Sequence, residues 1–322
     1  MSSLTIIMYH YVRPIADSRY PEIKGLEAAL FIKQLDYIQR NYNIVSPQRL
    51  IESLSDGPPL PSKAAMLTFD DGYRDHYDHV FPVLYRRGLS GGFYPPANAI
   101  QRRKMLDVNK IHFILASEPN KEKLVREIDE AVENAQDGCK LLSPAEYRAK
   151  CDVCRYDTPE VVYIKRMLQT LLPEDLRNQI ADSLFRKFVS VDEKSFADDL
   201  YMNEEQLRRM LDCGMHVGAH GSEHYWLGHL DKAEQEADVD AAMDFLSTLQ
   251  VPNGQFSFCY PYGSFNQATL DIMRSRACKF GLTTVPDIAD VTAKTALTLP
   301  RLDTNDLPKD GMAKPNDWTR KG

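Results

Sequence analysis

Short apolar runs alternate with longer amphipathic stretches along most of the chain. The apolar runs have the length of strands and occur at residues 4–9, 64–69, 92–94, 214–219, 256–260 and 278–283. Between them lie stretches with apolar side chains at helical spacing, at residues 28–42, 47–54, 231–249 and 267–276. Strands that alternate with helices predict a parallel sheet covered by helices, either open or closed into a barrel.

The pattern changes between about residue 98 and residue 200, where helix follows helix. The stretches 121–135, 159–172 and 173–189 carry apolar stripes among charged side chains, without convincing strands between them. We expect a helical subdomain inserted after the third strand, serving either as a lid or as a packing or dimerisation appendage. The expected division is 1–97 and 201–307 for the α/β part, 98–200 for the insertion and 308–322 for a polar, loosely held tail.

Two adjacent carboxylates, Asp70 and Asp71, end the apolar run at residues 64–69 and precede Gly72. If they are buried side by side, both cannot remain cheaply ionised without a cation. A metal ion would resolve this conflict. The alternative is a strand that simply runs into an Asp-Gly turn, which is a common event.

A pair of histidines supports the interpretation of the carboxylates as part of a metal site. His220 and His224 are four residues apart, a spacing that brings both rings to one side of a helical turn or tight loop. They follow the apolar run at residues 214–219, so both candidate groups lie where a strand gives way to a loop. One aspartate and two histidines suit zinc or another divalent first-row metal and leave open positions for water.

Three segments resemble, in the same order, the first three motifs of the polysaccharide deacetylase (NodB-homology) family. They are Thr68-Phe69-Asp70-Asp71-Gly72, His220-Gly221-Ser222-Glu223-His224 and Phe258-Cys259-Tyr260-Pro261-Tyr262-Gly263. The resemblance covers roughly residues 1–97 and 201–307 and implies an irregular (β/α) barrel of the NodB type with an inserted helical subdomain. It also implies that Asp70 is the general base. One divalent metal ion, with zinc favoured and cobalt or nickel as alternatives, would be held by Asp71, His220 and His224.

The general acid is absent from its usual place. Most members of the family carry it on a histidine in a late Leu-x-His motif, but no histidine follows His229 in this chain. The poly-N-acetylglucosamine deacetylases, a branch that looks circularly permuted, supply this histidine from the first strand. Because Met8-Tyr9-His10-Tyr11-Val12 resembles that arrangement, His10 is expected to be the general acid. The alternative is a core or surface histidine without a catalytic role.

The third motif also departs from the family pattern. Many relatives have an arginine before its proline, whereas residues 256–259 are Phe-Ser-Phe-Cys here. Arg301 is the nearest late candidate for a cation beside the base, and a surface arginine is the alternative. Tyr262 resembles the position whose backbone N–H faces the developing oxyanion. Its ring would line either the sugar site or the barrel wall.

Composition excludes other classes of protein. The net charge of −7 argues against a nucleic-acid binder, and no apolar run approaches the roughly 20 residues of a transmembrane segment. Residues 1–8 lack a basic region and a long apolar core, which favours a first strand over a signal peptide. We therefore expect a cytoplasmic protein with reduced thiols. Cys151 and Cys154, with Cys139 upstream, could bind a structural zinc, but without an apparent fourth ligand free thiols are favoured.

These features and the resemblance together imply a metal-dependent carbohydrate N-deacetylase. Such a hydrolase would remove an N-acyl group, most simply acetyl, from an amino sugar or a surface-glycan precursor. The expected partner is an acylated amino-sugar substrate, and a homo-oligomer could form through the helical insertion. Two alternatives stay open: an amidase acting on a non-sugar amide such as an acylated polyamine or cyclic imide, and a non-catalytic glycan-binding protein that retained the metal.

Overall fold

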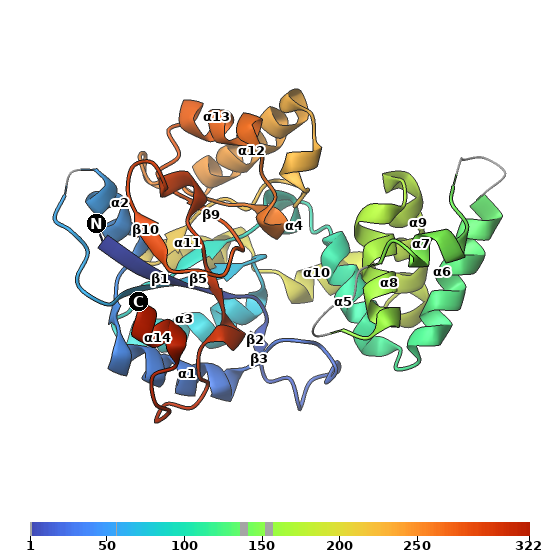
Figure 1. Ribbon diagram of the computed structural model, residues 1–322, viewed down its shortest axis with the longest axis horizontal. Coiled ribbons are helices and arrows are strands. Elements are labelled where there is room, and N and C mark those ends of the chain that lie inside the picture. The colour runs from blue at the N-terminus through green and yellow to red at the C-terminus, as the bar shows by residue number, and fades with distance from the viewer. Residues whose placement is uncertain (1, 56, 136–140, 152–156) are drawn as a thin grey trace. The chain divides into compact units, whose positions relative to one another are not determined.

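A computed structural model describes residues 2–55, 57–135, 141–151 and 157–322 (Figure 1). The chain divides into two compact units. The first unit contains Met1–Pro14, Gly25–Lys104 and Ala197–Gly322, and the second contains Ile15–Lys24 and Met105–Phe196. The second unit thus includes a segment near the start of the chain that the sequence pattern assigned to the barrel. The predicted domain limits are otherwise close to these boundaries and stay a prediction.

A parallel sheet forms the centre of the first unit. Its main strands, in spatial order, are β1 (Ser2–Tyr9), β5 (Ala64–Asp70), β6 (Gly92–Tyr94) and β7 (His216–Val217). The short strand β4 (Asn43–Ile44) pairs with the start of β5, and β10 (Ala289–Val291) runs antiparallel to the start of β1. All seven residues of β5 are buried, which explains why this strand is an unbroken apolar run up to Asp70.

Two-residue strands close this sheet into a ring. Ala219, just after β7, pairs with β8 (Phe258–Cys259), which runs parallel to β9 (Gly281–Leu282). Leu282 in turn pairs with Leu299, which precedes β11 (Leu302–Asp303), and β11 lies parallel to β1. The order β1, β5, β6, β7, β8, β9, β11 therefore returns to β1. This arrangement confirms the expected irregular (β/α) barrel.

Helices cover the outside of the barrel, and several of them begin at a side-chain cap. They are α1 (Ala28–Asn41), α2 (Pro47–Leu54), α3 (Phe81–Arg86), α4 (Ala97–Gln101), α11 (Glu204–Asp212), α12 (Lys232–Thr248), α13 (Gln267–Ser275) and α14 (Asp317–Lys321). Asn203, Asp231 and Asn266 each accept a hydrogen bond from a backbone N–H in the first turn of α11, α12 and α13. A separate pair of two-residue strands, β2 (Val12–Arg13) and β3 (Leu26–Glu27), flanks the excursion into the second unit.

The second unit is helical, as the sequence predicts, and its described residues contain no strand. Its helices are α5 (Asp107–Ser117), α6 (Lys121–Ala135), α7 (Pro144–Arg148), α8 (Pro159–Arg166), which continues as a π-helical turn over Met167–Leu171, and α9 (Glu174–Phe188). The next helix, α10 (Glu193–Leu200), contains the boundary at Phe196. Lys110 is buried in this unit, and its ammonium group is neutralised by Asp182 and Glu193 at 2.5 and 3.0 Å.

The expectation of a loosely held tail at residues 308–322 is wrong. These residues end in α14, and the Thr319 hydroxyl is buried 2.7 Å from the Tyr37 hydroxyl of α1. The Lys63 ammonium donates to the Thr319 carbonyl oxygen. A polar segment is thus fixed by hydrogen bonds to the barrel instead of by an apolar face of its own.

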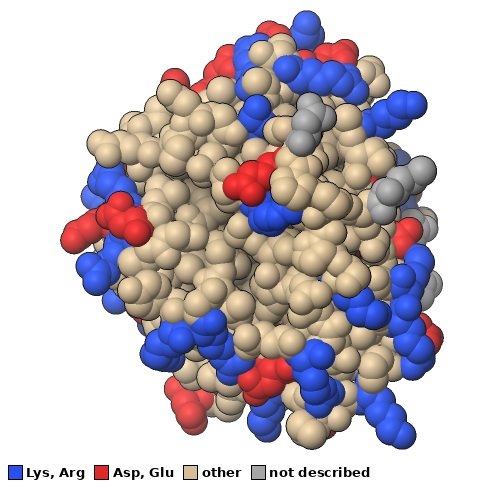
Figure 2. All heavy atoms as spheres, turned by 90° about the vertical axis from the view of Figure 1, so that its left-hand side faces the viewer, with Lys and Arg blue, Asp and Glu red and all other residues tan. Residues whose placement is uncertain are grey.

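The surface around the amino-terminal end of β1 carries little charge. Figure 2 shows this side of the molecule, on which most lysine, arginine, aspartate and glutamate side chains lie toward the margins, apart from acidic and basic side chains next to each other near the middle. Strand β1 runs away from this face (Figure 1), so its carboxyl end and the two aspartates at the end of the neighbouring β5 lie elsewhere. None of the described helices combines the length and apolar character that crossing a membrane requires.

Candidate metal and catalytic site

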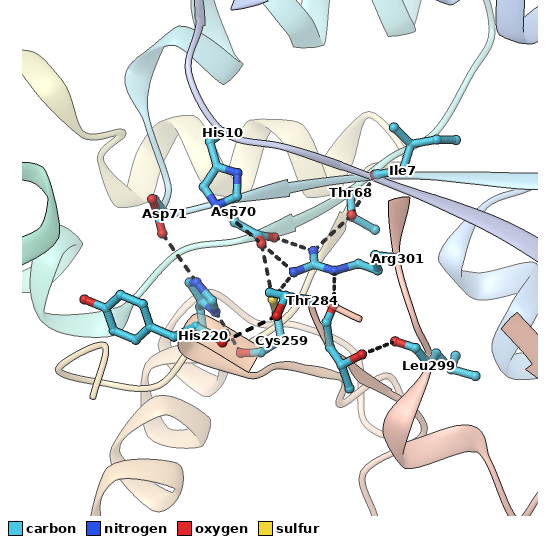
Figure 3. Close-up of polar contacts among 12 residues, drawn as sticks. Ile7, His10, Thr68, Asp70, Asp71, His220, Cys259, Thr284, Leu299 and Arg301 are labelled. Atoms are coloured by element: carbon cyan, nitrogen blue, oxygen red, sulfur yellow. Dashed lines mark hydrogen bonds and ion pairs between the residues drawn. The ribbon is translucent and has the colours of Figure 1, made fainter. Parts of the chain in front are cut away.

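The sequence-predicted residues meet at the carboxyl ends of the barrel strands (Figure 3). Asp70 is the last residue of β5 and Asp71 follows it, while His220 and His224 lie on the loop after β7. Parallel strands in a barrel direct all their carboxyl ends to one rim, so residues distant in sequence converge there. Both aspartates and both histidines are buried.

Asp71 and the two histidines present their ligand atoms to one another. Asp71 Oδ1 lies 3.3 Å from His220 Nε2 and 3.4 Å from His224 Nε2, and it has no hydrogen-bond partner among the described residues. Ligands of a tetrahedral zinc ion with bonds of about 2.0–2.1 Å are separated by about 3.3–3.4 Å. The donor set, its spacing and the unpartnered oxygen therefore fit a divalent metal.

Neighbouring groups turn each ligand atom toward this point. His220 Nδ1 lies 2.7 Å from the Cys259 carbonyl oxygen and donates its hydrogen there, which leaves Nε2 as the lone-pair nitrogen. The Tyr73 hydroxyl donates to Asp71 Oδ2 at 2.6 Å, so that Oδ1 is the oxygen facing the histidines. Burial favours the neutral acid, yet the neighbouring imidazoles hold the pKa of Asp71 well below its ordinary value.

The backbone at this rim is unusual for residues that carry side chains. Asp71, His224 and Tyr262 adopt positive φ values of 69°, 60° and 58°, in the left-handed region. Such conformations typically cost about 1–3 kcal/mol each and persist where surrounding structure imposes them. Gly72, with φ of 69°, must be glycine because a Cβ atom would come within 2.7 Å of Pro95. The backbone is thus strained to aim these side chains.

Arg301 is the cation beside the second carboxylate, Asp70. Its Nη1 and Nη2 donate to Asp70 Oδ1 and Oδ2 at 2.9 and 2.7 Å, and its Nε donates to the Thr283 carbonyl oxygen. Because Arg301 is only 1% exposed, the alternative of a surface arginine is wrong. Burial disfavours the charged form of Asp70, but the guanidinium outweighs it and lowers the pKa of Asp70 to about 2.

His10 lies next to Asp70, on the exposed side of the site. Its Nε2 is 4.0 Å from Asp70 Oδ2, and its side chain is 40% exposed. The buried His76 donates from Nε2 to the His10 carbonyl oxygen at 2.7 Å, and burial lowers the pKa of His76 to about 4, so that this ring is neutral. His10 is thus placed within reach of a substrate bound beside Asp70. Its role as general acid stays a prediction.

Tyr262 belongs to the wall of the metal site. Its ring centroid is 4.7 Å from that of His224, and the Trp226 ring stacks on it at 4.2 Å. The Thr284 hydroxyl donates to the Tyr262 carbonyl oxygen at 3.4 Å. These contacts place Tyr262 beside the ligands, while the function of its backbone N–H toward an oxyanion stays a prediction.

Cys259 was not expected at the site. Its Sγ lies 3.0 Å from Arg301 Nη2 and 3.4 Å from Asp70 Oδ2, in the segment where the family pattern led us to expect an arginine. With Asp70 and His220 it forms a second buried group of ligand atoms. This group does not fit a metal, because Arg301 covers both Asp70 oxygens and His220 Nδ1 is engaged by a carbonyl.

Two further residues support the site and were missed by sequence reasoning. Tyr73 follows the Asp-Asp-Gly motif by one residue, and this position was the only signal of its role. For Asp238, on α12, the sequence contained no signal of a role at the site. Of the cysteines considered as a zinc site, Cys151 donates from its thiol to the Tyr147 carbonyl oxygen at 3.5 Å, whereas residues 139 and 154 lie outside the described part of the chain.

Comparison with known sequences points to one family. The family model described as "Polysaccharide deacetylase" matches residues 188–281. The poly-beta-1,6-N-acetyl-D-glucosamine N-deacetylase of Escherichia coli (strain K12) is 38% identical over 80 residues. This match covers 24% of the chain and only 12% of the E. coli protein, so it concerns a small part of that relative.

Comparison with solved structures extends the similarity over nearly the whole chain. The deacetylase PplD of Streptococcus pyogenes, in complex with acetate, superposes with a TM-score of 0.56 at 18% identity and covers 95% of this chain and 93% of its own. IcaB from Ammonifex degensii superposes with a TM-score of 0.56 at 19% identity, and the match covers 99% of this chain and 94% of IcaB. These structures share the fold. The family model matched over residues 188–281 and the motifs at the rim of the barrel agree with the resemblance to the polysaccharide deacetylase family.

Proposed function

We propose that this protein is a metal-dependent N-deacetylase acting on an N-acetylated amino sugar, in a glycan or in a glycan precursor. The observation that carries the proposal is the convergence of Asp71, His220 and His224 at 3.3–3.4 Å, beside an ionised carboxylate. The family supports hydrolysis of a carbohydrate amide. The E. coli relative, named for poly-beta-1,6-N-acetyl-D-glucosamine, supports N-acetylglucosamine as the sugar.

The metal held by Asp71, His220 and His224 would acidify a water molecule and polarise the carbonyl of the amide. Asp70 would accept the proton that this water loses on attack. Because Arg301 lowers the pKa of Asp70 to about 2, Asp70 is ionised at neutral pH but is a weak base. It can therefore deprotonate only a water that is already acidified, which couples its role to an occupied metal site.

The remaining residues would handle the leaving group and the oxyanion. His10, beside Asp70 and partly exposed, would donate a proton to the departing amine as the C–N bond breaks. The backbone N–H of Tyr262 would stabilise the negative charge that develops on the carbonyl oxygen. The products are acetate and the free amino sugar, and no covalent intermediate with the protein is required.

The alternatives are less well supported by the site. A protein that only binds glycans needs neither a buried Arg301–Asp70 pair nor a histidine beside it, and burying such a pair is costly. A non-sugar amide would use the same catalytic groups, so the substrate has to be tested directly. The cytoplasmic location and the homo-oligomer stay predictions, which cell fractionation and light scattering would test.

The decisive experiment is mass spectrometry of candidate substrates after incubation with zinc-loaded protein. The substrates are β-1,6-linked N-acetylglucosamine oligomers, a nucleotide-linked N-acetylglucosamine and, as the non-sugar amide, an acetylated polyamine. We expect loss of acetyl groups from a sugar substrate only, with stoichiometric release of acetate. His220→Ala and chelator-treated protein serve as controls. Turnover of the polyamine alone would replace the proposal with the amidase alternative, and no turnover with fully loaded protein would contradict catalysis.

A further inference from the structure

We infer that Asp238 is a positioning residue for the metal ligands: its carboxylate fixes the backbone of the loop that joins His220 to His224. The inference rests on the metal site proposed above. Asp238 lies in the middle of α12, whose cap is Asp231, so its carboxylate does not serve to start that helix. It is 6% exposed.

The contacts of Asp238 are concentrated on the short stretch between the two histidines. Its Oδ1 accepts hydrogen bonds from the backbone N–H groups of Ser222 and Glu223 at 3.0 and 2.9 Å. Hydrogen bonds to a charged acceptor are stronger than those between neutral groups. One carboxylate oxygen thereby sets the orientation of two successive peptide units directly before His224.

The other oxygen of Asp238 occupies the space next to Gly221. This glycine has a φ of +69°, and a Cβ atom on it would lie 2.7 Å from Asp238 Oδ2. The loop therefore excludes a side chain at this position both by its backbone conformation and by the presence of the carboxylate. Oδ2 has no hydrogen-bond partner among the described residues, which is costly for a buried carboxylate oxygen. Because this buried oxygen lacks a partner, the carboxylate of Asp238 lowers the stability of the fold in this respect, and we infer that it serves to position the loop.

The opposite side of the loop is held by α4. The backbone N–H groups of Ala97 and Asn98 donate to the carbonyl oxygens of Gly221 and Ser222 at 3.1 and 3.0 Å. With Asp238 binding the N–H groups and α4 binding the carbonyl groups, the peptide units of the loop are fixed from two sides. The next residue in the chain is His224, whose φ of 60° lies in the strained left-handed region.

Loss of the Asp238 carboxylate would thus remove the acceptor of the Ser222 and Glu223 N–H groups, of which the first is buried, and allow the loop to relax. The strain at His224 would then be relieved by rotation of its backbone, which moves its Nε2 away from Asp71. Residues that orient ligands from outside the ligand set typically contribute about 10–100-fold to metal affinity. The effect should appear as weaker metal binding, beyond any loss of fold stability.

The test measures zinc affinity by competition with a chelator, the absorption spectrum of the cobalt-substituted protein, and the melting temperature with and without metal. Asp238→Ala should weaken zinc binding ~10-fold or more and change the cobalt spectrum. Asp238→Asn keeps one oxygen for the two N–H groups and should restore most of the affinity. The matched control is Asp244→Asn, an exposed aspartate on the same helix, which should behave as wild type.

A purely structural role predicts a different result. In that case Asp238→Ala would lower the melting temperature of metal-free and loaded protein equally and bind zinc with wild-type affinity, and the inference would be overturned. If Asp238→Ala does not fold, Gly221→Ala tests the same contact from the loop side and should also weaken zinc binding ~10-fold. Wild-type affinity in Gly221→Ala would then overturn the inference. Wild-type protein that binds no metal would overturn the proposed function itself.

Discussion

Replacing Arg301 with glutamine should destabilise the fold, and more strongly at neutral pH than in acid. Arg301 makes two hydrogen bonds to Asp70, at 2.9 and 2.7 Å, and both side chains are almost fully buried. Glutamine is shorter and uncharged, so it removes the compensating charge and leaves the carboxylate buried. Breaking a buried ion pair by removing one partner typically costs about 3–5 kcal/mol.

The direction of the pH dependence follows from the pKa of Asp70. In the wild type the pKa falls from 3.8 to about 2, which corresponds to about 2 kcal/mol of stability. This stability is present above pH 3.8 and is lost as the pH falls through about 2. Without Arg301, burial dominates and raises the pKa of Asp70 above its ordinary value. The carboxylate then opposes folding as the pH rises, so the difference between wild type and variant grows with pH.

The assay is urea unfolding of metal-free protein, in chelator, at about pH 4.5 and about pH 8. Arg276→Gln is the matched control, because Arg276 forms a two-point hydrogen bond with Asp240 at 2.8 Å, but at the surface. Its loss should change the free energy of unfolding little at either pH. If Arg301→Gln were no more destabilising than Arg276→Gln at about pH 8, the role of the buried charge pair would be refuted.

Four further substitutions separate the roles of the site residues. Asp70→Asn should retain the metal but lose ~10²-fold or more in turnover, whereas Asp71→Asn should also lose metal; equal metal loss by elemental analysis would mean that the pair is misassigned. His10→Ala should bind metal normally and lose ~10²-fold or more on an acetamide, but far less on an activated ester whose leaving group needs no proton; equal losses would contradict the general-acid role. Tyr73→Phe, which removes the hydrogen bond to Asp71 Oδ2, should weaken zinc binding by about 10-fold in chelator competition, and an unchanged affinity would show that Tyr73 does not orient the ligand.

Local signals in the sequence were enough to predict the elements that carry the ligands. The buried strand β5 is an unbroken apolar run, and the carboxylates that end it are visible because they interrupt that run. Helix α2 has the predicted limits, since Ser46 and Pro47 mark its start. The convergence of Asp71 with His220 and His224 was predicted because each follows a strand.

Other parts of the site depend on contacts between residues distant in sequence. Strands β8 and β9 lie within the predicted runs 256–260 and 278–283 but have only two residues each, so their limits depend on pairing with their neighbours. Strand β11, also of two residues, lies outside the predicted runs. Asp238 is one of several acidic residues on an amphipathic helix, and nothing local separates it from Asp244. The turn of α14 is likewise fixed by Tyr37, more than two hundred residues earlier. Such long-range contacts cannot be predicted from the pattern of residues within a short segment of the sequence.

The closure of the barrel by its first and last strands has a consequence for the order of events during synthesis. β1 leaves the ribosome long before its partner β11. Arg301, which precedes β11, follows Asp70 by 231 residues. A nascent chain that has not reached Arg301 holds Asp70 without its cation and β1 with one edge unpaired, a state prone to association with other chains. The Asp70–Arg301 pair and the closed barrel can therefore form only after Arg301 and β11 have been synthesised.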